Sequence, residues 1–244
     1  MSPYLWVAMN GADATLANQA VTANNLANAD TTGFRRELSA TRALPVRGSA
    51  LPTQVYTADE TPGSDLQPGP VTRTGRPLDV AVNGRGWILV QAPDGKPALT
   101  RNGDLTISAS GVLETANGHP VLNANRQPIT LPPMSSLQIG EDGTVSGVPQ
   151  GSQANAPATL GRIGLVNPPR SSLYRGKDGL FRSRGPLTST ANVSLTPRAL
   201  EGSNVNSVDS MLHLIQDART FEAQIRLART SADNANASAK ILNI

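Results

Sequence analysis

The strongest constraint on this chain is an apolar stripe that runs along its C-terminal part. Between residue 204 and about residue 243, uncharged residues recur in alternating steps of three and four. This spacing keeps them on one face of an α-helix, as in the seam of a coiled coil. Ser203 or Asn204 is the expected N-cap. The stripe consists of Met211, Leu214, Ala218, Phe221, Ile225, Ala228, Ala232, Ala235, Ala239 and Leu242. Such a helix is about 60 Å long, more than a small domain spans.

A second helix is expected near the N-terminus, over residues 4–28. This stretch has no proline, and Gly11 is its single glycine. The turn-forming residues 28–33 end the helix, with Gly33 expected at positive φ and Phe34 anchoring the chain after it. The same three-and-four spacing gives a narrow stripe of Leu5, Met9, Ala12, Leu16, Gln19, Ala23 and Leu26.

The middle of the sequence has the pattern of an antiparallel β domain. Short apolar runs are separated by Asn-Gly, Asp-Gly and Ser-Gly turn signals. Strands are expected over 78–82, 87–90, 105–107, 112–113, 120–122 and 161–166. The expected organisation is an α+β fold with coiled-coil-like terminal helices: helix and turn 1–33, extended connector 34–74, β domain 75–184, connector 185–203 and helix 204–244.

Composition excludes several classes of function. Cysteine is absent, which rules out disulfides, thiolate zinc sites and a cysteine nucleophile. Aromatic residues make up only 3%, so a large aromatic-lined ligand pocket is hard to build. The net charge of +3 is weak support for binding nucleic acid or a membrane. No apolar run has the length of a transmembrane helix, and the N-terminus does not have the pattern of a cleaved secretory signal.

No residue pattern points to catalysis or metal binding. His119 lies in a turn and His213 lies one residue off the C-terminal stripe, each without a clustered carboxylate. Asp94, Asp104 and Asp142 are explained by turn formation. The densest basic stretch, residues 170–184, has little aromatic interleaving, which favours a solvated face or an acidic neighbour over nucleic acid. We therefore assign no catalytic residue, cofactor or metal.

The two helices need a partner. An isolated helix gains most of its stability from packing of its apolar face. The terminal helices must therefore pair with each other, with copies of themselves or with relatives. This arrangement suits an assembly subunit. An enzyme or carbohydrate-binding module on the β domain is the alternative from another class, and a nucleic-acid-binding module is a weaker third.

Several segments closely resemble bacterial flagellar rod and hook proteins. Residues 23–34 (ANNLANADTTGF) resemble the family's N-terminal signature, and residues 200–208 (LEGSNVNSV) resemble its entry into the C-terminal helix. Residues 219–222 (RTFE) continue that match. In the middle, residues 74–82, 100–103 and 110–113 resemble β-domain segments of the family. The resemblance covers nearly the whole chain in the expected order.

Within this family the proximal rod subunits are most similar, and a distal rod or hook-type axial subunit is the alternative. The resemblance implies a structural subunit of the basal-body rod that spans the periplasm and transmits torque from motor to hook. It also implies export through the flagellar type III apparatus without a cleaved signal. The implied partners are other rod subunits and copies of the chain, without nucleic acid or direct membrane insertion.

The expected assembly residues lie at both ends. Asn residues near the end of the first helix either fix register at subunit contacts or fray the helix end and face water, and the resemblance favours register. The N-terminal set is Leu5, Met9, Leu16, Asn24, Asn25, Leu26, Asn28, Gly33 and Phe34. The C-terminal set is Ser203, Asn204, Val205 and the stripe residues from Met211 to Leu242.

Overall fold

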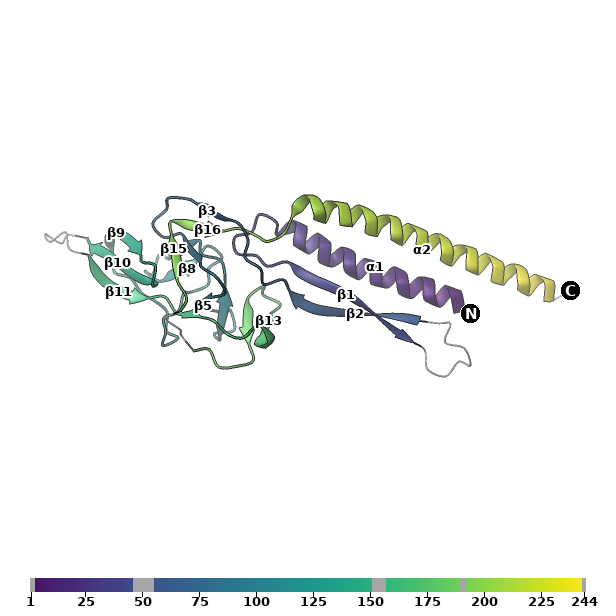
Figure 1. Ribbon diagram of the computed structural model, residues 1–244, viewed down its shortest axis with the longest axis horizontal. Helices are drawn as coiled ribbons and strands as arrows, with labels where there is room; N and C mark the ends of the chain where they lie inside the picture. Colours follow the sequence, from purple (N-terminus) through teal and green to yellow (C-terminus); the bar gives the residue numbers. More distant parts are fainter. Residues whose placement is uncertain (1–2, 46–54, 151–156, 189–191, 243–244) are drawn as a thin grey trace. The chain divides into compact units, whose positions relative to one another are not determined.

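The computed structural model describes residues 3–45, 55–150, 157–188 and 192–242 (Figure 1). The chain divides into two compact units. The helical unit comprises Met1–Ala29, Glu37–Asp65 and Val205–Ile244. The β unit comprises Asp30–Arg36 and Leu66–Asn204. Two long helices and a mainly antiparallel set of strands confirm the predicted α+β class.

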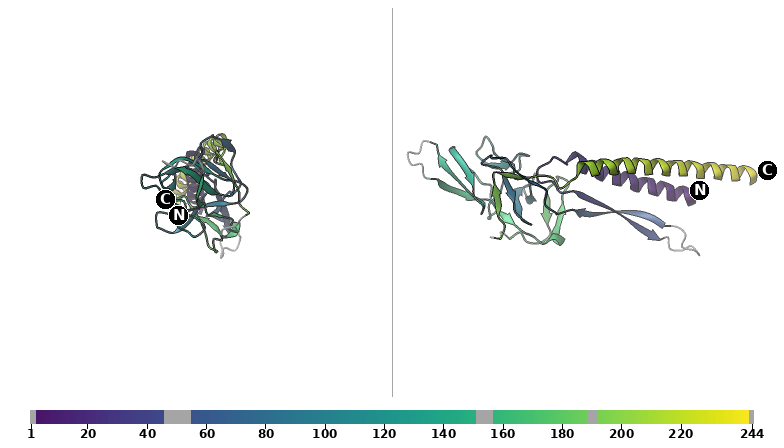
Figure 2. Two further views of the ribbon diagram at one scale, coloured as in Figure 1. Left: turned by 90° about the vertical axis from the view of Figure 1, so that its left-hand side faces the viewer. Right: turned by 45° about the horizontal axis from the view of Figure 1, so that its top comes forward.

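The helical unit contains a helix from each end of the chain. Helix α1 (Pro3–Ala27) and helix α2 (Ser207–Leu242) run antiparallel and side by side (Figures 1 and 2). With 25 and 36 residues, they are about 37 Å and 54 Å long. The C-terminal turns of α2 therefore extend beyond the start of α1, as Figure 2 shows. These turns have no α1 residues beside them within the unit.

Two strands accompany α1 where an extended connector was expected. Strand β1 (Glu37–Pro45) pairs antiparallel with β2 (Val55–Ser64), with a register shift between Leu38 and Ala40. Both strands pack along α1 (Figure 1). The residues are extended, as their composition indicates, but they are paired and belong to the helical unit. The expected connector, residues 34–74, is therefore divided between the two units: residues 37–65 belong to the helical unit and the remainder to the β unit.

The start of α2 corrects the expected N-cap. The side-chain Oδ1 of Asn206 accepts hydrogen bonds from the backbone N–H groups of Val208 (3.0 Å) and Asp209 (3.2 Å). Asn206 is therefore the N-cap, and the prediction of Ser203 or Asn204 is wrong. The Asn204 side chain is already engaged in the β unit, where its Oδ1 accepts the Arg36 N–H and its Nδ2 donates to the Gln67 carbonyl.

Among its described residues, the β unit contains a five-stranded sheet, a three-stranded sheet and three strand pairs, all antiparallel. The larger sheet has the order β12 (Leu165–Val166), β5 (Trp87–Gln91), β6 (Pro97–Thr100), β14 (Phe181–Ser183) and β13 (Leu173–Arg175). The smaller has the order β11 (Ala158–Arg162), β10 (Thr144–Pro149) and β9 (Met134–Ile139). The pairs are β15 (Leu195–Pro197) with β4 (Val80–Val82), β16 (Ala199–Glu201) with β3 (Val71–Arg73), and β7 (Leu105–Ile107) with β8 (Leu113–Thr115). A short 3₁₀ helix, η1 (Arg170–Ser172), precedes β13.

Three sequence expectations for the middle of the chain need correction. The single strand expected over 161–166 is two strands in different sheets, β11 and β12, with Gly164 between them, where a Cβ atom would lie 2.8 Å from the Asn123 carbonyl oxygen. Residues 120–122 form isolated bridges rather than a strand. The expected connector 185–203 contains β15 and β16, which return to pair with β4 and β3. The β unit thus extends beyond residues 75–184 in both directions.

The core of the β unit lies on both faces of β5. Ile88 and Val90 pack into the main hydrophobic cluster, whereas Trp87 and Leu89 pack into a second cluster with Phe181. This alternation follows from the two-residue period of a strand. The Trp87 and Phe181 ring centroids are 4.6 Å apart. Because β5 is buried on both faces, it fixes the position of the turn over residues 83–86 that precedes Trp87.

Candidate assembly site

Two segments from opposite ends of the sequence meet in the β unit. We call residues 30–36 and 198–204 the end segments, because each adjoins one of the terminal helices. The Gly33 N–H donates to the Glu201 carbonyl (2.7 Å), and the Asn204 N–H donates to the Phe34 carbonyl (3.3 Å). The Arg36 N–H donates to Asn204 Oδ1 at 2.6 Å. Together these contacts form a junction, within the β unit, between the segment that follows α1 in the sequence and the segment that precedes α2.

Gly33 is required at this junction by its backbone conformation and by its surroundings. Its φ is +70°, as expected from the sequence. A Cβ atom there would lie 2.3 Å from the carbonyl carbon of Arg101. The N-terminal end segment therefore crosses the backbone after β6 at a distance that only glycine permits.

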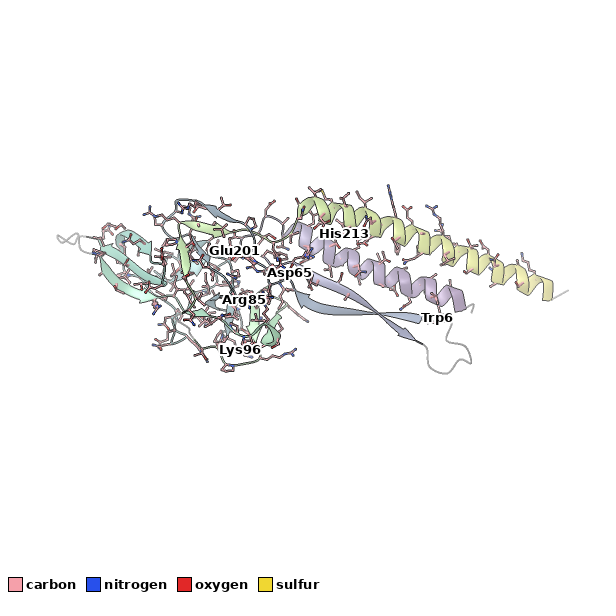
Figure 3. The ribbon with its side chains drawn as sticks, in the orientation of Figure 1. Trp6, Asp65, Arg85, Lys96, Glu201 and His213 are labelled. Carbon is pink, nitrogen blue, oxygen red and sulfur yellow. The ribbon has the colours of Figure 1, made fainter. Side chains whose placement is uncertain are left out.

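A fully buried carboxylate holds the junction together. Glu201 Oε1 accepts from Arg35 Nη2 at 2.5 Å and from the Gly69 N–H at 3.0 Å. Glu201 Oε2 lies 3.3 Å from Arg101 Nη1. The Arg35 and Glu201 side chains have no exposed area (Glu201 is labelled in Figure 3). The carboxylate of the C-terminal end segment thus contacts the N-terminal end segment at Arg35 and two other parts of the β unit, at Gly69 and Arg101.

Two guanidinium groups share this one carboxylate. Arg101 also donates to the carbonyl oxygens of Val82 (2.8 Å) and Gly84. Burial lowers the pKa of Arg101 to about 10, with Glu201 opposing and Arg35 reinforcing the shift. Within the described part of the chain, Arg35 Nε, Arg35 Nη1 and Arg101 Nε have no hydrogen-bond partner. The junction therefore carries an excess of buried positive charge.

Phe34 anchors the N-terminal end segment, as the sequence predicts. Its side chain is buried, and the Arg175 guanidinium lies 4.3 Å above its ring, within cation–π range. Arg175 Nη1 also donates to the Arg35 carbonyl at 3.1 Å. Arg175, from the basic stretch 170–184, thus binds this chain's own end segment.

In the helical unit, Asn25 has a role that neither expected alternative describes. Its buried side chain donates to the Glu37 carbonyl (2.9 Å) and accepts from the Glu37 N–H (2.8 Å). This reciprocal pair ties α1 to the first residue of β1. Asn28 Nδ2 donates to the Asn24 carbonyl (2.9 Å) at the helix end, and the Asn24 side chain is exposed.

The two helices contact each other through small and polar residues. The Thr15 hydroxyl lies 3.0 Å from Gln224 Oε1 and 2.9 Å from the Gly11 carbonyl. A Cβ atom at Gly11 would lie 3.0 Å from Gln224 Nε2. Gly11 therefore lets the Gln224 side chain lie against α1.

The large apolar residues of α1 mostly face away from its neighbours within the unit. Ala8, Ala12 and Ala14 are buried, whereas the expected assembly residues Met9 and Leu16 are 51% and 45% exposed. Leu5 and Leu26 are half-buried. Trp6 and Met9, with Asn10 and Asp13, line a surface hollow of about 310 Å³ (Trp6 is labelled in Figure 3). The expected stripe is thus largely open on this side.

The expected stripe of α2 is divided between two environments. Half-buried positions are Leu214, Phe221, Ile225, Ala228 and Ala232, and exposed positions are Met211, Ala218 and Ala235. The side chains of Ala239 and Leu242 lie outside those that the structure describes. Val205 is half-buried in the helical unit, and in the β unit Ser203 is buried and Asn204 half-buried. Further exposed apolar residues of α2 are Val208, Leu212, Ile215 and Leu227.

Sequence reasoning missed the charged residues of the junction. Arg35, Arg101 and Glu201 lie in or beside segments that resemble the family, but no local pattern pairs residues so distant in sequence. It also missed Gly11, Thr15 and Gln224, which carry no apolar signal. The signal in the sequence was that Arg35, Arg101 and Glu201 are charged residues inside otherwise apolar or turn-forming segments.

The residues weighed for chemistry do not converge. His213 lies 3.6 Å from Asp209 on the exposed side of α2, one helical turn away, so the expectation that it has no carboxylate nearby is wrong. Asp142 forms hydrogen bonds to Thr144 in a turn, and these lower the pKa of its carboxyl group. Within the described residues, no group of His, Asp or Glu has metal-binding geometry. No helix of the described chain is long and apolar enough to cross a membrane.

These features define a class of structural protein. Its two terminal helices pair with each other and expose apolar faces, and its end segments meet within the β unit. Residues 5–35 match the model for flagella basal body rod proteins, and residues 196–241 match that for the C-terminal region of flagellar basal body rod FlgEFG proteins. Residues 81–147 match the flagellar hook protein FlgE/F/G D1 domain. The N-terminal and C-terminal matches include Arg35 and Glu201, respectively.

Full-length relatives carry the same assignment. The chain is 42% identical over 252 residues to the flagellar basal-body rod protein FlgF of Escherichia coli (strain K12), covering 100% of both chains. It is 40% identical, with the same coverage, to FlgF of Salmonella typhimurium. It is 31% identical to FlgG of Buchnera aphidicola subsp. Schizaphis graminum, covering 95% of this chain and 96% of that one. The chain belongs to the family of flagellar basal-body rod proteins and is of the F type.

Proposed function

We propose that this chain is a structural subunit of the proximal rod, the periplasmic drive shaft that transmits torque from the flagellar motor to the hook. The full-length identity to F-type rod proteins carries this proposal. The distal rod is less well supported, because the G-type relative described above is less similar. The chemistry of the described residues favours a structural role over an enzymatic one.

Assembly proceeds through the terminal helices. Large apolar residues on a helix surface gain free energy when a neighbouring helix covers them, at about 25 cal/mol per Å². Trp6, Met9 and Leu16 on α1 and Met211 and Ile215 on α2 are such residues. This arrangement supports coiled-coil-like contacts between subunits. The alanine-rich end of α2 would allow a neighbouring helix to approach closely.

The junction transfers load between the helices and the β unit. Two residues separate α1 from the segment that holds Arg35, and two residues separate the segment that holds Glu201 from α2. A force along either helix is therefore delivered through the backbone to a buried, charge-assisted contact. Such a contact breaks only at the cost of exposing or isolating buried charges.

The location and the export route are part of the same proposal. The subunit lies in the flagellar basal body and spans the periplasm. It leaves the cell interior through the flagellar type III export apparatus, without a cleaved signal peptide. Its partners are other rod subunits and copies of itself, without nucleic acid or direct membrane insertion.

The test replaces exposed apolar residues and measures incorporation. Met211→Asn combined with Ile215→Asn should lower the copies of the chain in purified hook–basal bodies at least tenfold, measured against hook protein by quantitative mass spectrometry. Gln216→Ser, at the exposed polar position that follows Ile215, is the matched control. Full incorporation of the double variant would contradict assembly through this face. Absence of the unmodified chain from basal bodies would contradict the rod assignment.

A further inference from the structure

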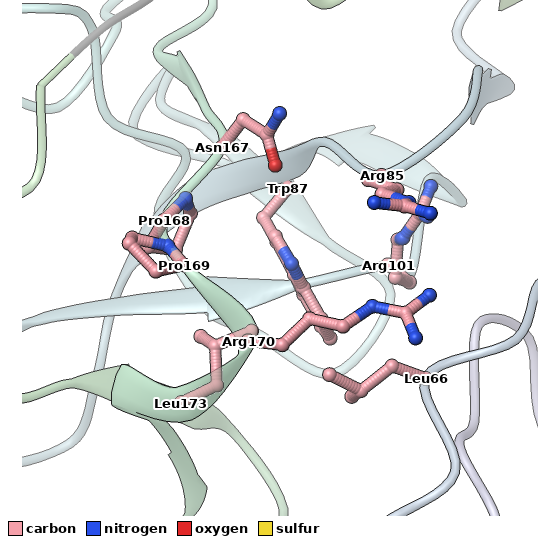
Figure 4. A pocket seen from close by; sticks show the side chains of 9 residues that line it. All are labelled: Leu66, Arg85, Trp87, Arg101, Asn167, Pro168, Pro169, Arg170 and Leu173. Carbon is pink, nitrogen blue, oxygen red and sulfur yellow. The ribbon is translucent and has the colours of Figure 1, made fainter.

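A small basic pocket lies in the β unit, away from both terminal helices in sequence. It has a volume of about 250 Å³, and Arg85, Arg101 and Arg170 line it together with Trp87. The three guanidinium groups gather on one side of the indole, as Figure 4 shows. Leu66, Pro168, Pro169 and Leu173 provide apolar walls, and Asn167 completes the lining.

Each arginine comes from a different structural element. Arg85 lies in the turn between β4 and β5, Arg101 directly follows β6, and Arg170 begins η1. Because β5 and β6 are paired and buried, the positions of Arg85 and Arg101 are set by the sheet. The Arg101 guanidinium carbon lies 5.5 Å from the centre of the Trp87 ring.

The charges of this pocket are not balanced by its own lining. No lining residue is acidic. Arg101 is 2% exposed, and its nearest carboxylate, Glu201, is shared with Arg35. Arg101 Nε has no hydrogen-bond partner among the residues that the structure describes. Three cations in one small cavity repel each other, and this repulsion is relieved when an anion enters.

We propose that this pocket binds the carboxylate of an acidic side chain from a neighbouring rod subunit, which rests on the proposed function. Guanidinium groups match carboxylate oxygens in planar, paired hydrogen bonds. The volume suits a side chain better than a larger cofactor. The leucine and proline walls contact the methylene groups of a glutamate, whereas a free oxoanion such as phosphate gains nothing from them.

The carboxylate preference is tested first in solution. The chain has two tryptophans, so Trp6→Phe leaves the Trp87 indole N–H as a single NMR signal. Glutarate and phosphate are titrated into this full-length variant at constant ionic strength. Glutarate should shift the signal saturably, with at least tenfold tighter apparent binding than phosphate. Arg85→Ala combined with Arg170→Ala should weaken the glutarate response at least tenfold, and exposed Arg73→Ala should not. No saturable shift, or equal binding of phosphate, overturns the proposal.

The source of the carboxylate is tested in cells. Arg85 and Arg170 are exposed at the pocket edge, so charge reversal leaves the fold intact. Arg85→Glu combined with Arg170→Glu should lower incorporation into hook–basal bodies at least tenfold, relative to Arg73→Glu. Replacing the matching Asp or Glu of an adjoining rod subunit by Lys should restore it. Incorporation equal to that of Arg73→Glu, or failure of every such replacement, overturns the proposal. The unmodified chain remains in the basal body in either case, which separates this result from failure of the rod assignment.

Discussion

Arg35 and Glu201 are 166 residues apart in sequence, yet their charged groups lie 2.5 Å apart and are fully buried. This contact joins the segment that follows α1 in the sequence to the segment that precedes α2. The chain thereby closes its two ends onto one β unit. A charge pair in such a place fixes which residues meet, whereas its net contribution to stability depends on how well both charges are compensated.

Glu201→Gln should strongly destabilise the β unit. The substitution keeps the side-chain shape but leaves Arg35 and Arg101 buried without a countercharge. Removing one partner of a buried ion pair costs about 3–5 kcal/mol. Urea unfolding of the Trp6→Phe chain, followed by Trp87 fluorescence, measures this change. Glu222→Gln removes an exposed pair with Arg226 and should leave the unfolding curve unchanged. Equal stability of both variants would show that the buried pair is dispensable.

Gly33→Ala separates backbone conformation from close contact. Both Gly33 (φ +70°) and Gly118 (φ +78°) have positive φ, but only Gly33 lacks space for a Cβ atom. Gly118→Ala should cost about 1–2 kcal/mol, the usual penalty for this conformation. Gly33→Ala should cost about 2 kcal/mol more, because the Arg101 backbone must move. The same denaturation experiment measures both. An identical loss of unfolding free energy in both variants would mean that the Arg101 backbone moves to accommodate the Cβ atom at no cost.

The sequence predicts the repeating elements of this structure better than its junction. Helix α1 ends one residue from the expected position because an unbroken helical pattern meets turn residues 28–33. The N-cap of α2 was missed by two residues or more, because Asn204 and Asn206 are equally good caps locally and a tertiary contact decides between them. The pairing of β15 and β16 with β4 and β3 is likewise invisible to local pattern.

The assembly residues show the same limit. Apolar spacing identifies which residues of α1 and α2 are candidates for helix contacts. It does not show that Ala8 and Ala12 are buried within the unit while Met9 and Leu16 are exposed. That division depends on the rotation of α1 against α2 and β2, which the contact of Thr15 with Gln224 helps to set.

Asn25→Ala should loosen the contact between α1 and β1. The change removes both hydrogen bonds to the Glu37 backbone, and each unsatisfied buried group costs about 1–3 kcal/mol. Hydrogen exchange of the Glu37 amide should therefore accelerate at least tenfold. Asn24→Ala, at an exposed neighbouring position, is the control. Unchanged exchange at Glu37 would indicate that the strand pair holds this residue without α1.

Acid should weaken the β unit partly through Asp178. Hydrogen bonds from Arg182 lower the pKa of the Asp178 carboxyl group below its usual value of 3.8. Between the lowered pKa and pH 3.8, the folded state therefore binds fewer protons at Asp178 than the unfolded state does. The stabilisation by Asp178 is complete above pH 3.8 and is lost as the pH falls through the lowered pKa. Asp178→Asn should therefore differ most from the unmodified chain near pH 6 and least near pH 2. Repeating the comparison in an Arg182→Gln background should abolish the difference, and a difference that persists there would exclude this ion pair as the cause.

In the isolated chain, the amides of α1 and α2 should exchange faster than those of β5 and β6. The residues that α1 buries within its unit are mainly small, such as Ala8 and Ala14, and its large apolar residues are exposed. Little apolar area therefore opposes local opening of the helices, whereas β5 is buried on both faces. Hydrogen-exchange mass spectrometry on the monomer should show at least a hundredfold difference in protection. If neighbouring helices cover the exposed residues in the rod, as proposed above, the difference should shrink in purified hook–basal bodies. Equal protection of helices and strands in the monomer would mean that the helical unit is already complete before assembly.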